Sequence, residues 1–170
     1  MYEDNQREDT FYAYMAGIID GEGTIGFARY KANPVTGSIK YIPYIQVVNT
    51  NCLVIEMASK LFCNSTIRKH IGSKNGFQSR LDCYATRIAG PLKVPTIIKK
   101  IYPYLVIKKE LADIIMDYCL NKKNFEGRPH KGQQSKIPIE ESQWRANIYA
   151  KYISIIHPQR LNRTTHESVK

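Results

Sequence analysis

Hydrophobic residues near the start of the chain follow a helical spacing and then an alternating one. Residues 10–22 carry an apolar face with side chains three or four positions apart, made by Phe11, Tyr14, Met15, Ile18 and Ile19. After Gly23 the spacing changes to two, which predicts strands over residues 24–30 and 40–48 with a turn at 33–38. This part of the chain therefore predicts a helix followed by a β-hairpin with one polar, partly aromatic face.

The same order recurs in the next part of the chain. Helical spacing predicts a helix over residues 52–62, and strands follow over residues 66–71 and 78–88. In the longer strand we expect an inward-facing set formed by Leu81, Cys83 and Ala85. The outward-facing set is expected to be Gln78, Arg80, Asp82, Tyr84 and Thr86. The alternation breaks at Arg87 and Ile88, which predicts a bulge or a strand end there.

Three further helices are predicted over residues 94–101, 108–121 and 139–156. A basic loop over residues 122–136 separates the last two, and a tail follows from 157 to 170. The order α-β-β-α-β-β-α-α-α predicts an α+β fold: an α-β-β-α-β-β core with a four-stranded antiparallel saddle sheet, helices on one face, and C-terminal helices. We expect one domain over residues 1–170, with its core at about residues 10–121.

The charge of the chain favours a polyanionic partner. Lys and Arg number 25 against 15 Asp and Glu, a formal net charge of +10. Nucleic acid is the first candidate and an anionic membrane surface the second. No apolar run approaches the ~20 residues that a membrane span needs, so we expect no membrane insertion. The polar, acidic residues 1–10 lead us to expect neither a signal peptide nor a transit peptide.

Cysteine and histidine spacing gives no sign of a zinc site. The four cysteines, Cys52, Cys63, Cys83 and Cys119, form no C-x-x-C pair, and the four histidines are scattered. We expect reduced thiols and a reducing intracellular compartment, either the cytoplasm and nucleoid or an organelle matrix, rather than secretion.

Glycines and carboxylates meet at the end of the first predicted helix. Asp20 and Glu22 lie among Gly17, Gly21 and Gly23, where the helix must stop. Each glycine in a helix costs about 1 kcal/mol relative to alanine. That cost is tolerable if a second backbone packs on a strip without large side chains, here Ala13, Ala16, Gly17 and Gly21. The alternative is a core helix with a glycine C-cap and solvent-exposed acids.

Residues 15–23, MAGIIDGEG, resemble the nine-residue signature of the LAGLIDADG homing endonucleases. The chain holds one copy, and the order of elements extends the resemblance to about residues 10–120. The resemblance implies an intron-encoded, site-specific double-strand DNA endonuclease that cuts a long, roughly palindromic site. One motif per chain implies a homodimer, with Ala13, Ala16, Gly17, Asp20 and Gly21 at its interface.

The resemblance also assigns roles around this motif. Glu22 is implied to be the metal ligand, together with the backbone carbonyl of Gly21, and Asp20 is given a structural role at the helix end. A single acid per chain suffices if two chains meet, because Mg²⁺ takes one or two carboxylates plus phosphate oxygens and water. We expect Mg²⁺, with Mn²⁺ as a second option and Ca²⁺ binding without supporting cleavage.

Two further positions match family residues that act near the metal. Asn49 falls where the family keeps a polar side chain that orients water, and Lys108 falls on the active-site lysine. The alternatives are that Asn49 caps the next helix and that Lys108 is a solvated first-turn residue. Leu53 stands where some relatives carry a further basic residue, so that role is unassigned.

The polar faces of the two predicted hairpins offer a surface for double-stranded DNA. Arg and Gln can read base edges in the major groove and Asp can accept from cytosine. The candidates are Tyr30, Lys40, Tyr44, Gln46, Arg68, His70, Arg80, Asp82, Tyr84 and Thr86. The other readings are a non-cutting binder, such as a maturase acting on host-intron RNA or a transcription factor, and a basic module in which the motif is coincidence.

Overall fold

The structure is a computed structural model that describes residues 2–31, 39–71, 82–122 and 138–158. Its elements follow in the predicted order: α1 (Tyr2–Glu22), β1 (Gly23–Lys31), β2 (Ile39–Asn49), α2 (Cys52–Leu61), β3 (Ile67–His70), β4 (Cys83–Ala89), α3 (Lys93–Ile101), the 3₁₀ turn η1 (Tyr102–Tyr104), α4 (Lys109–Lys122) and α5 (Ile139–Ile156). The α+β class is therefore confirmed. The predicted basic loop and the tail beyond residue 158 lie outside the described residues.

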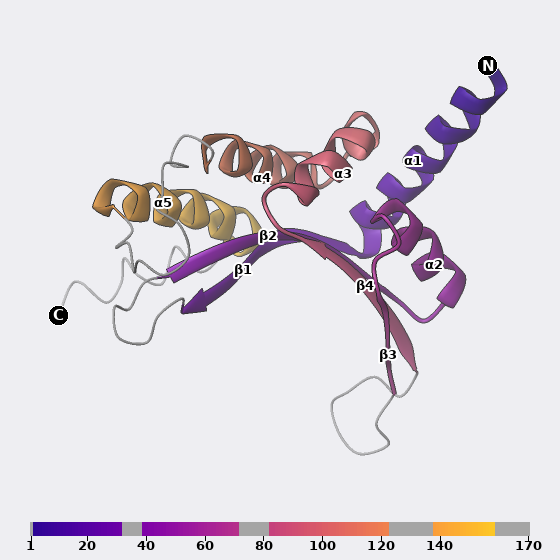
Figure 1. The fold of residues 1–170 in the computed structure, drawn as a ribbon, viewed down its shortest axis with the longest axis horizontal. Helices are drawn as coiled ribbons and strands as arrows, with labels where there is room; N and C mark the ends of the chain where they lie inside the picture. The colour runs from indigo at the N-terminus through magenta and orange to yellow at the C-terminus, as the bar shows by residue number, and fades with distance from the viewer. Residues whose placement is uncertain (1, 32–38, 72–81, 123–137, 159–170) are drawn as a thin grey trace, which may run out of the picture.

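The strands form one antiparallel sheet in the order β1-β2-β4-β3. Gly23 pairs with Val47 at the start of β1, and Tyr44 pairs with Ala89 at the end of β4. Figure 1 shows the sheet arching beneath the helices, and no described helix lies under its concave side. The sheet therefore presents one face to the core and leaves the other for a partner.

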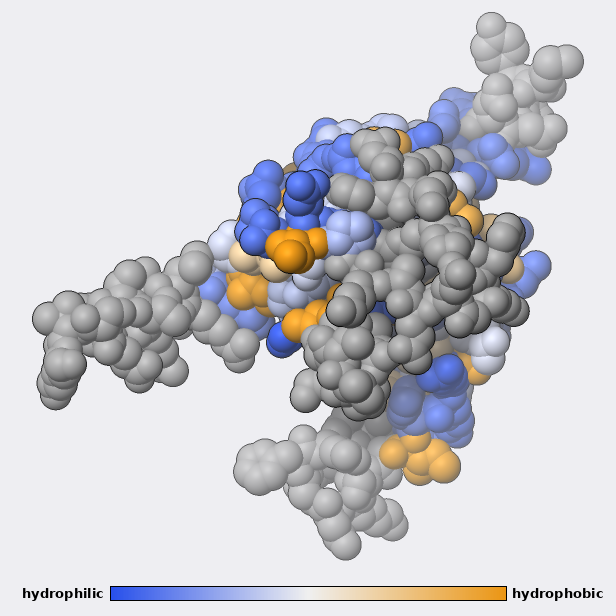
Figure 2. Space-filling model, turned by 60° about the vertical axis from the view of Figure 1, so that its left-hand side comes forward, coloured by the Kyte–Doolittle hydropathy of each residue, from blue (hydrophilic) through white to orange (hydrophobic). Residues whose placement is uncertain are grey.

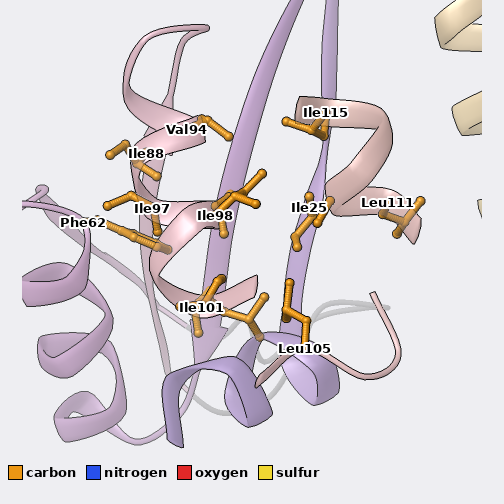
Figure 3. Packing of buried hydrophobic residues seen from close by; sticks show 14 of the residues in the cluster. Ile25, Phe62, Ile88, Val94, Ile97, Ile98, Ile101, Leu105, Leu111 and Ile115 are labelled. Atoms are coloured by element: carbon orange, nitrogen blue, oxygen red, sulfur yellow. The ribbon is translucent and has the colours of Figure 1, made fainter. Parts of the chain in front are cut away.

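The core lies between the sheet and helices α1, α3 and α4. Ile25 of β1 and Ile88 of β4 meet Ile98 of α3 and Ile115 of α4, and all four are at most 6% exposed (Figure 3). Leu105, just after η1, packs into the same cluster. These aliphatic side chains hold the end of α1 and the start of α4 against the sheet.

Helix α1 differs from its predicted pattern in two ways. It begins at Tyr2, well before residue 10, so the polar N-terminal residues are helical. The hydrophobic spacing places Tyr14 on the apolar face, but Tyr14 is 47% exposed, whereas Met15, Ala16 and Ile19 are fully buried. The buried face is centred on Met15, Ala16 and Ile19, and Tyr14 lies on the exposed side of the helix together with Gly17 and Gly21.

The predicted facing of β4 is wrong. Thr86 is 1% exposed and stands opposite Val47 of the core, while Ala85 and Arg87 lie on the concave face opposite Val48 and Gln46. A polar residue is tolerated inside because the Thr86 hydroxyl bonds to Ser65 Oγ at 2.6 Å and donates to the Thr66 carbonyl at 3.2 Å. The pairing with β2 runs unbroken from Tyr84 to Ala89, where β4 ends. Of the bulge or strand end expected at Arg87 and Ile88, this described strand therefore has no bulge and ends one residue later.

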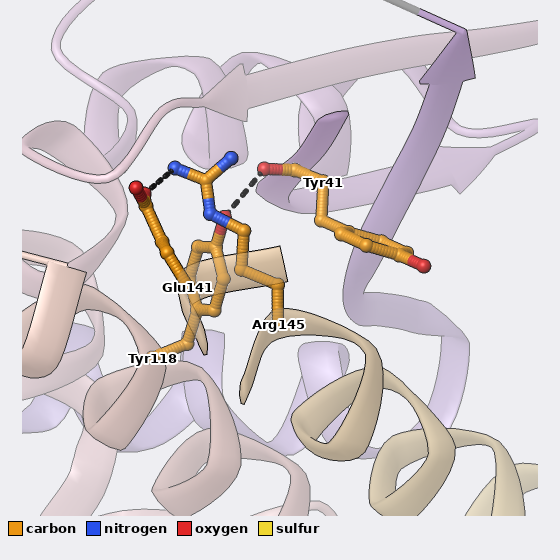
Figure 4. A network of polar contacts seen from close by, with 4 residues as sticks. All are labelled: Tyr41, Tyr118, Glu141 and Arg145. Atoms are coloured by element: carbon orange, nitrogen blue, oxygen red, sulfur yellow. Dashed lines mark hydrogen bonds and ion pairs between the residues drawn. The ribbon is translucent and has the colours of Figure 1, made fainter. Parts of the chain in front are cut away.

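A buried polar cluster lies where helix α5 packs against α4 and β2 (Figure 4). Arg145 and Glu141 form an ion pair with side chains 5% and 1% exposed, and the Tyr118 hydroxyl of α4 donates to the Tyr41 carbonyl of β2 at 2.9 Å. Burial raises the pKa of Tyr118 to about 12, so this donor stays protonated. Trp144 stacks on the Tyr118 ring with centroids 5.4 Å apart. The C-terminal helix therefore packs on α4 and on the outer part of β2.

Exposed apolar side chains on the face drawn in Figure 2 form separate small patches among hydrophilic residues. The described helices include none with the length and apolar character needed to cross a membrane.

Candidate active site and nucleic-acid interface

The Asp20 carboxylate links the end of α1 to the start of α4. It accepts backbone N–H groups from Val106 at 2.7 Å, Ile107 at 3.2 Å and Lys108 at 2.8 Å. The first N–H groups of a helix have no partner within the helix, and α4 begins at Lys109. Asp20 therefore caps α4 from a distant part of the chain, which is the structural role predicted for it.

The environment of Asp20 favours its ionised form. Burial raises the pKa of this carboxyl, but the three N–H donors and the Lys108 ammonium together lower it further, so its pKa lies below the usual value. The charged carboxylate is thus part of the folded connection between α1 and α4.

Lys108 makes the reciprocal connection. Its Nζ donates to the carbonyl of Ile19 at 2.7 Å and also to that of Asp20. These carbonyls belong to the last turn of α1, where acceptors lack helical partners and a cation is favoured. Burial lowers the pKa of Lys108, although the nearby Asp20 charge opposes this shift. Lys108 is therefore not a freely solvated first-turn residue, because its ammonium is held at the end of α1 that carries Glu22.

Glu22 and Asn49 come together although they lie 27 residues apart in the chain. Asn49 Nδ2 donates to Glu22 Oε2, while Asn49 Oδ1 accepts the Asn51 N–H at 2.7 Å. That second bond orients the amide so that its NH₂ group points to the carboxylate. Asn51, and not Asn49, caps α2, since its side chain accepts the Leu53 N–H at 3.0 Å.

The donor set at the end of α1 suits a hard divalent cation. Glu22 is exposed and provides carboxylate oxygens, and the adjacent Gly21 provides a backbone carbonyl. Within the described part of the chain, no group of three or more His, Cys, Asp and Glu residues could hold a metal alone. The residues of one chain fit part of a metal site that further oxygens, from phosphate, water or a second chain, would complete.

A strip of α1 with little side-chain bulk faces solvent next to this site. A Cβ built on Gly17 or Gly21 would meet nothing within 4 Å, and Ala13 is exposed as well. Ala16 is fully buried, so the expectation that it lines the strip is wrong, and Asp20, predicted at the dimer interface, is 8% exposed. We call the exposed small residues Ala13, Gly17 and Gly21 the bare strip.

Most of the predicted DNA-contacting residues share the concave face of the sheet. The pairs Tyr30 with Lys40 and Thr24 with Gln46 place these side chains on one side, and the same side carries Tyr44, Arg68 and His70. Tyr30 is half exposed, and Lys40, Arg68 and His70 are exposed. This set forms a basic and polar surface without an overlying described helix (Figure 1).

The remaining predicted contacts within the described residues are not part of that surface. Tyr84 and Thr86 lie on the opposite side of β4, where Thr86 is buried and Tyr84 packs against the core. Asp82 precedes the strand and pairs with Lys69 at 2.8 Å. Arg80 lies outside the described residues. The predictions for Tyr84 and Thr86 are therefore wrong, and the inverted facing of β4 is the reason.

Because β4 faces the opposite way from the prediction, Arg87 was not predicted as part of the DNA-contacting surface. Arg87 is exposed on the concave face, and its guanidinium carbon lies 3.8 Å from the ring centroid of Tyr44. The sequence feature that could have placed Arg87 outside is the spacing of two between Tyr84, Thr86 and Ile88. Reading these three as the core-facing set would have placed Arg87 outside.

Comparisons with known proteins give one consistent result. No family model and no curated protein sequence matches the chain. Among solved structures, the homing endonuclease I-CvuI in complex with a DNA target has a TM-score of 0.59 and 16% identity, over 85% of this chain and 97% of that one. The homing endonuclease I-TnaI has a TM-score of 0.57 and 21% identity, over 92% and 96%. The LAGLIDADG homing endonuclease I-GzeII, in complex with its DNA target, has a TM-score of 0.58 and 16% identity, over 87% and 49%.

The chain thus has the fold of the LAGLIDADG homing endonucleases. The resemblance that rested on nine residues is confirmed across the architecture.

Proposed function

We propose that this chain, with its LAGLIDADG homing-endonuclease fold, is a site-specific double-strand DNA endonuclease that works as a homodimer. The observation that carries the proposal is Glu22, an exposed carboxylate at the end of α1 held by Asn49. Lys108 binds the carbonyls of the same turn, and the bare strip lies beside it. Acid, amide and ammonium thus gather at one helix end.

DNA is the partner that suits the concave face of the sheet. Its cations and polar aromatic side chains can contact phosphates and base edges, and the net charge of +10 favours a polyanion. The solved structures of I-CvuI and I-GzeII, which have this fold, are complexes with DNA targets. We propose double-stranded DNA as the substrate and a reducing compartment as the place of action.

The exposed bare strip of α1 supports the proposed dimer. Gly17 and Gly21 are open, and helix–helix packing would use the space that their missing side chains leave. Val106 and Ile107, 82% and 74% exposed, lie beside the last turn of α1, because their N–H groups bind Asp20. The chain spans nearly all of I-CvuI and I-TnaI but 49% of I-GzeII, which fits one domain for each half of a DNA site.

Divalent metal would be held by Glu22 and the carbonyl of Gly21, with Mg²⁺ or Mn²⁺ supporting cleavage and Ca²⁺ only binding. The bound ion would neutralise phosphate charge and activate water for attack. Asn49 orients the carboxylate and presents an amide to nearby solvent. Lys108 keeps a positive charge beside the reacting phosphate while fixing the turn on which Glu22 stands.

The test is selection of a cognate site from a random double-stranded library, followed by incubation of that site with Mg²⁺, Ca²⁺ or EDTA. We expect cleavage of both strands with Mg²⁺, binding alone with Ca²⁺, and no cleavage with EDTA. Specific binding without cleavage in any divalent metal would overturn the nuclease proposal and favour a non-cutting DNA binder. Preference for an intron RNA over every DNA would favour the maturase reading instead.

A further inference from the structure

Arg87 and Tyr44 form a stacked pair in the middle of the concave face. The guanidinium carbon lies 3.8 Å from the ring centroid, close enough for both cation–π attraction and planar stacking. Their strands β2 and β4 are the two inner strands of the sheet. The pair is therefore flanked by β1 on one side and by β3 on the other.

The register explains how the two side chains meet. Arg87 stands opposite Gln46, and Tyr44 stands opposite Ala89, so Arg87 and Tyr44 are diagonal neighbours on one face. The neighbours of Arg87 along that face are Ala85 and Ala89, whose side chains are too short to cover it. The guanidinium thus rests on the ring, and the Arg87 side chain is exposed.

The hydrogen-bonding edge of Arg87 is not taken up by an acid. Among the described residues, the ion pairs are Lys69 with Asp82 and Arg145 with Glu141, and neither involves Arg87. Stacking uses the flat face of the guanidinium and leaves its fork of N–H donors for a planar acceptor pair. Holding the side chain on Tyr44 also removes rotamer freedom before a ligand arrives.

We propose that Arg87 reads a guanine in each half of the DNA site, and that Tyr44 is the positioning residue that holds it. A bidentate contact from arginine to guanine O6 and N7 in the major groove suits a guanidinium held at the centre of a concave sheet. Lys40, Arg68 and His70 are better suited to the backbone, because β3 is an edge strand and Lys40 lies near the outer end of β2. This inference rests on the proposed DNA-binding function.

The experiment compares the base preference of wild type, Arg87→Ala, Arg87→Lys, Tyr44→Phe and Tyr44→Leu by library selection and competition binding in Ca²⁺. For Arg87→Ala we expect loss of a guanine preference at one position per half-site and roughly 5- to 150-fold weaker binding of the selected site. Affinity for unrelated DNA should change far less. Arg87→Lys should lose the preference too, because an ammonium cannot make the bidentate contact.

The tyrosine variants test positioning separately. Tyr44→Phe keeps the ring and should keep the guanine preference, whereas Tyr44→Leu should weaken it with Arg87 still present. Lys99→Ala removes an exposed cation from α3 on the helix side of the sheet and controls for net charge. If Arg87→Ala lost affinity equally for all DNA sequences, or kept the guanine preference, the inference about Arg87 would be overturned and the proposed function would stand. Absence of sequence-specific DNA binding by the wild type would instead overturn the proposed function.

Discussion

The Asn49 side chain joins the end of β2 to the end of α1 through the Glu22 carboxylate. Its Nδ2 donates to Glu22 while its Oδ1 receives the Asn51 N–H, so both halves of the amide are used. The Asn49 amide can fix the position of the Glu22 carboxylate because the Asn51 N–H fixes the orientation of the amide. A motif acid and a strand residue thereby act as one unit, which gives the first predictions.

Glu22→Gln should abolish metal-dependent cleavage and leave DNA binding intact. In EDTA the affinity should be unchanged or tighter, because the substitution removes negative charge beside the phosphates. Cleavage of a labelled cognate duplex and its binding in EDTA are the two measurements. Glu140→Gln, at an exposed acid of α5, is the matched control and should cut normally. Metal-dependent cutting by Glu22→Gln would contradict the assigned role.

Asn49→Ala and Asn51→Ala should have different effects, because Asn49 is proposed to act in cleavage and Asn51 caps helix α2. Asn51→Ala removes the α2 cap and should lower the free energy of unfolding by about 1 kcal/mol with cleavage retained. Asn49→Ala should slow cleavage roughly 10- to 100-fold, since Glu22 loses its orienting partner. Urea unfolding and single-turnover cleavage measure the two effects. The assignment fails if Asn49→Ala destabilises α2 but cuts at the wild-type rate.

Gly17→Ala should have opposite effects on the single chain and on the dimer. Nothing in one chain lies within 4 Å of the new Cβ, so the monomer should gain roughly 1 kcal/mol from the better helix former. A second helix packed on the bare strip would be pushed away, and dimerisation should weaken. Sedimentation across a concentration series measures association, with Asn147→Ala, at an exposed position of α5, as the control. Unchanged association would place the partner elsewhere.

Asp20→Asn should change how stability depends on pH. The folded pKa of Asp20 lies below its usual 3.8, so the stability it confers is complete above that value and disappears as pH falls through the folded pKa. At neutral pH the variant should be less stable by roughly 1–3 kcal/mol, because the N–H groups of residues 106–108, just ahead of α4, lose a charged acceptor. Chemical unfolding of both proteins between pH 7 and pH 2 should show this gap closing with acid. A gap that persists at the lowest pH would exclude the ionised cap as its cause.

DNA binding should weaken steeply with salt. Each phosphate neutralised by Lys or Arg releases counterions, so several such contacts predict roughly a thousandfold loss or more between about 50 and 200 mM salt. Fluorescence anisotropy with a labelled duplex in Ca²⁺ gives the slope. A flat response would count against the concave face as a DNA surface.

The sequence by itself determined the order of elements and singled out the residues of the proposed site. A change of hydrophobic spacing at Gly23 marks the boundary of α1 and β1 to the residue, because helices and strands bury side chains at different periods. The motif singled out Glu22, the resemblance to the family added Asn49, and the structure brings the two together. The local sequence pattern is enough to predict a helix or a strand where residues close together in the chain decide which of the two forms.

Only the tertiary structure decided which way β4 faces and what Asp20 and Lys108 bind. Alternation shows that a strand has two faces, but Thr86 could enter the core only because Ser65 and Thr66 satisfy its hydroxyl there. Asp20 and Lys108 meet across 88 residues of chain, a separation at which no periodicity carries information. Arg87 likewise stacks on Tyr44 through strand register, which is set by the packing of the whole sheet.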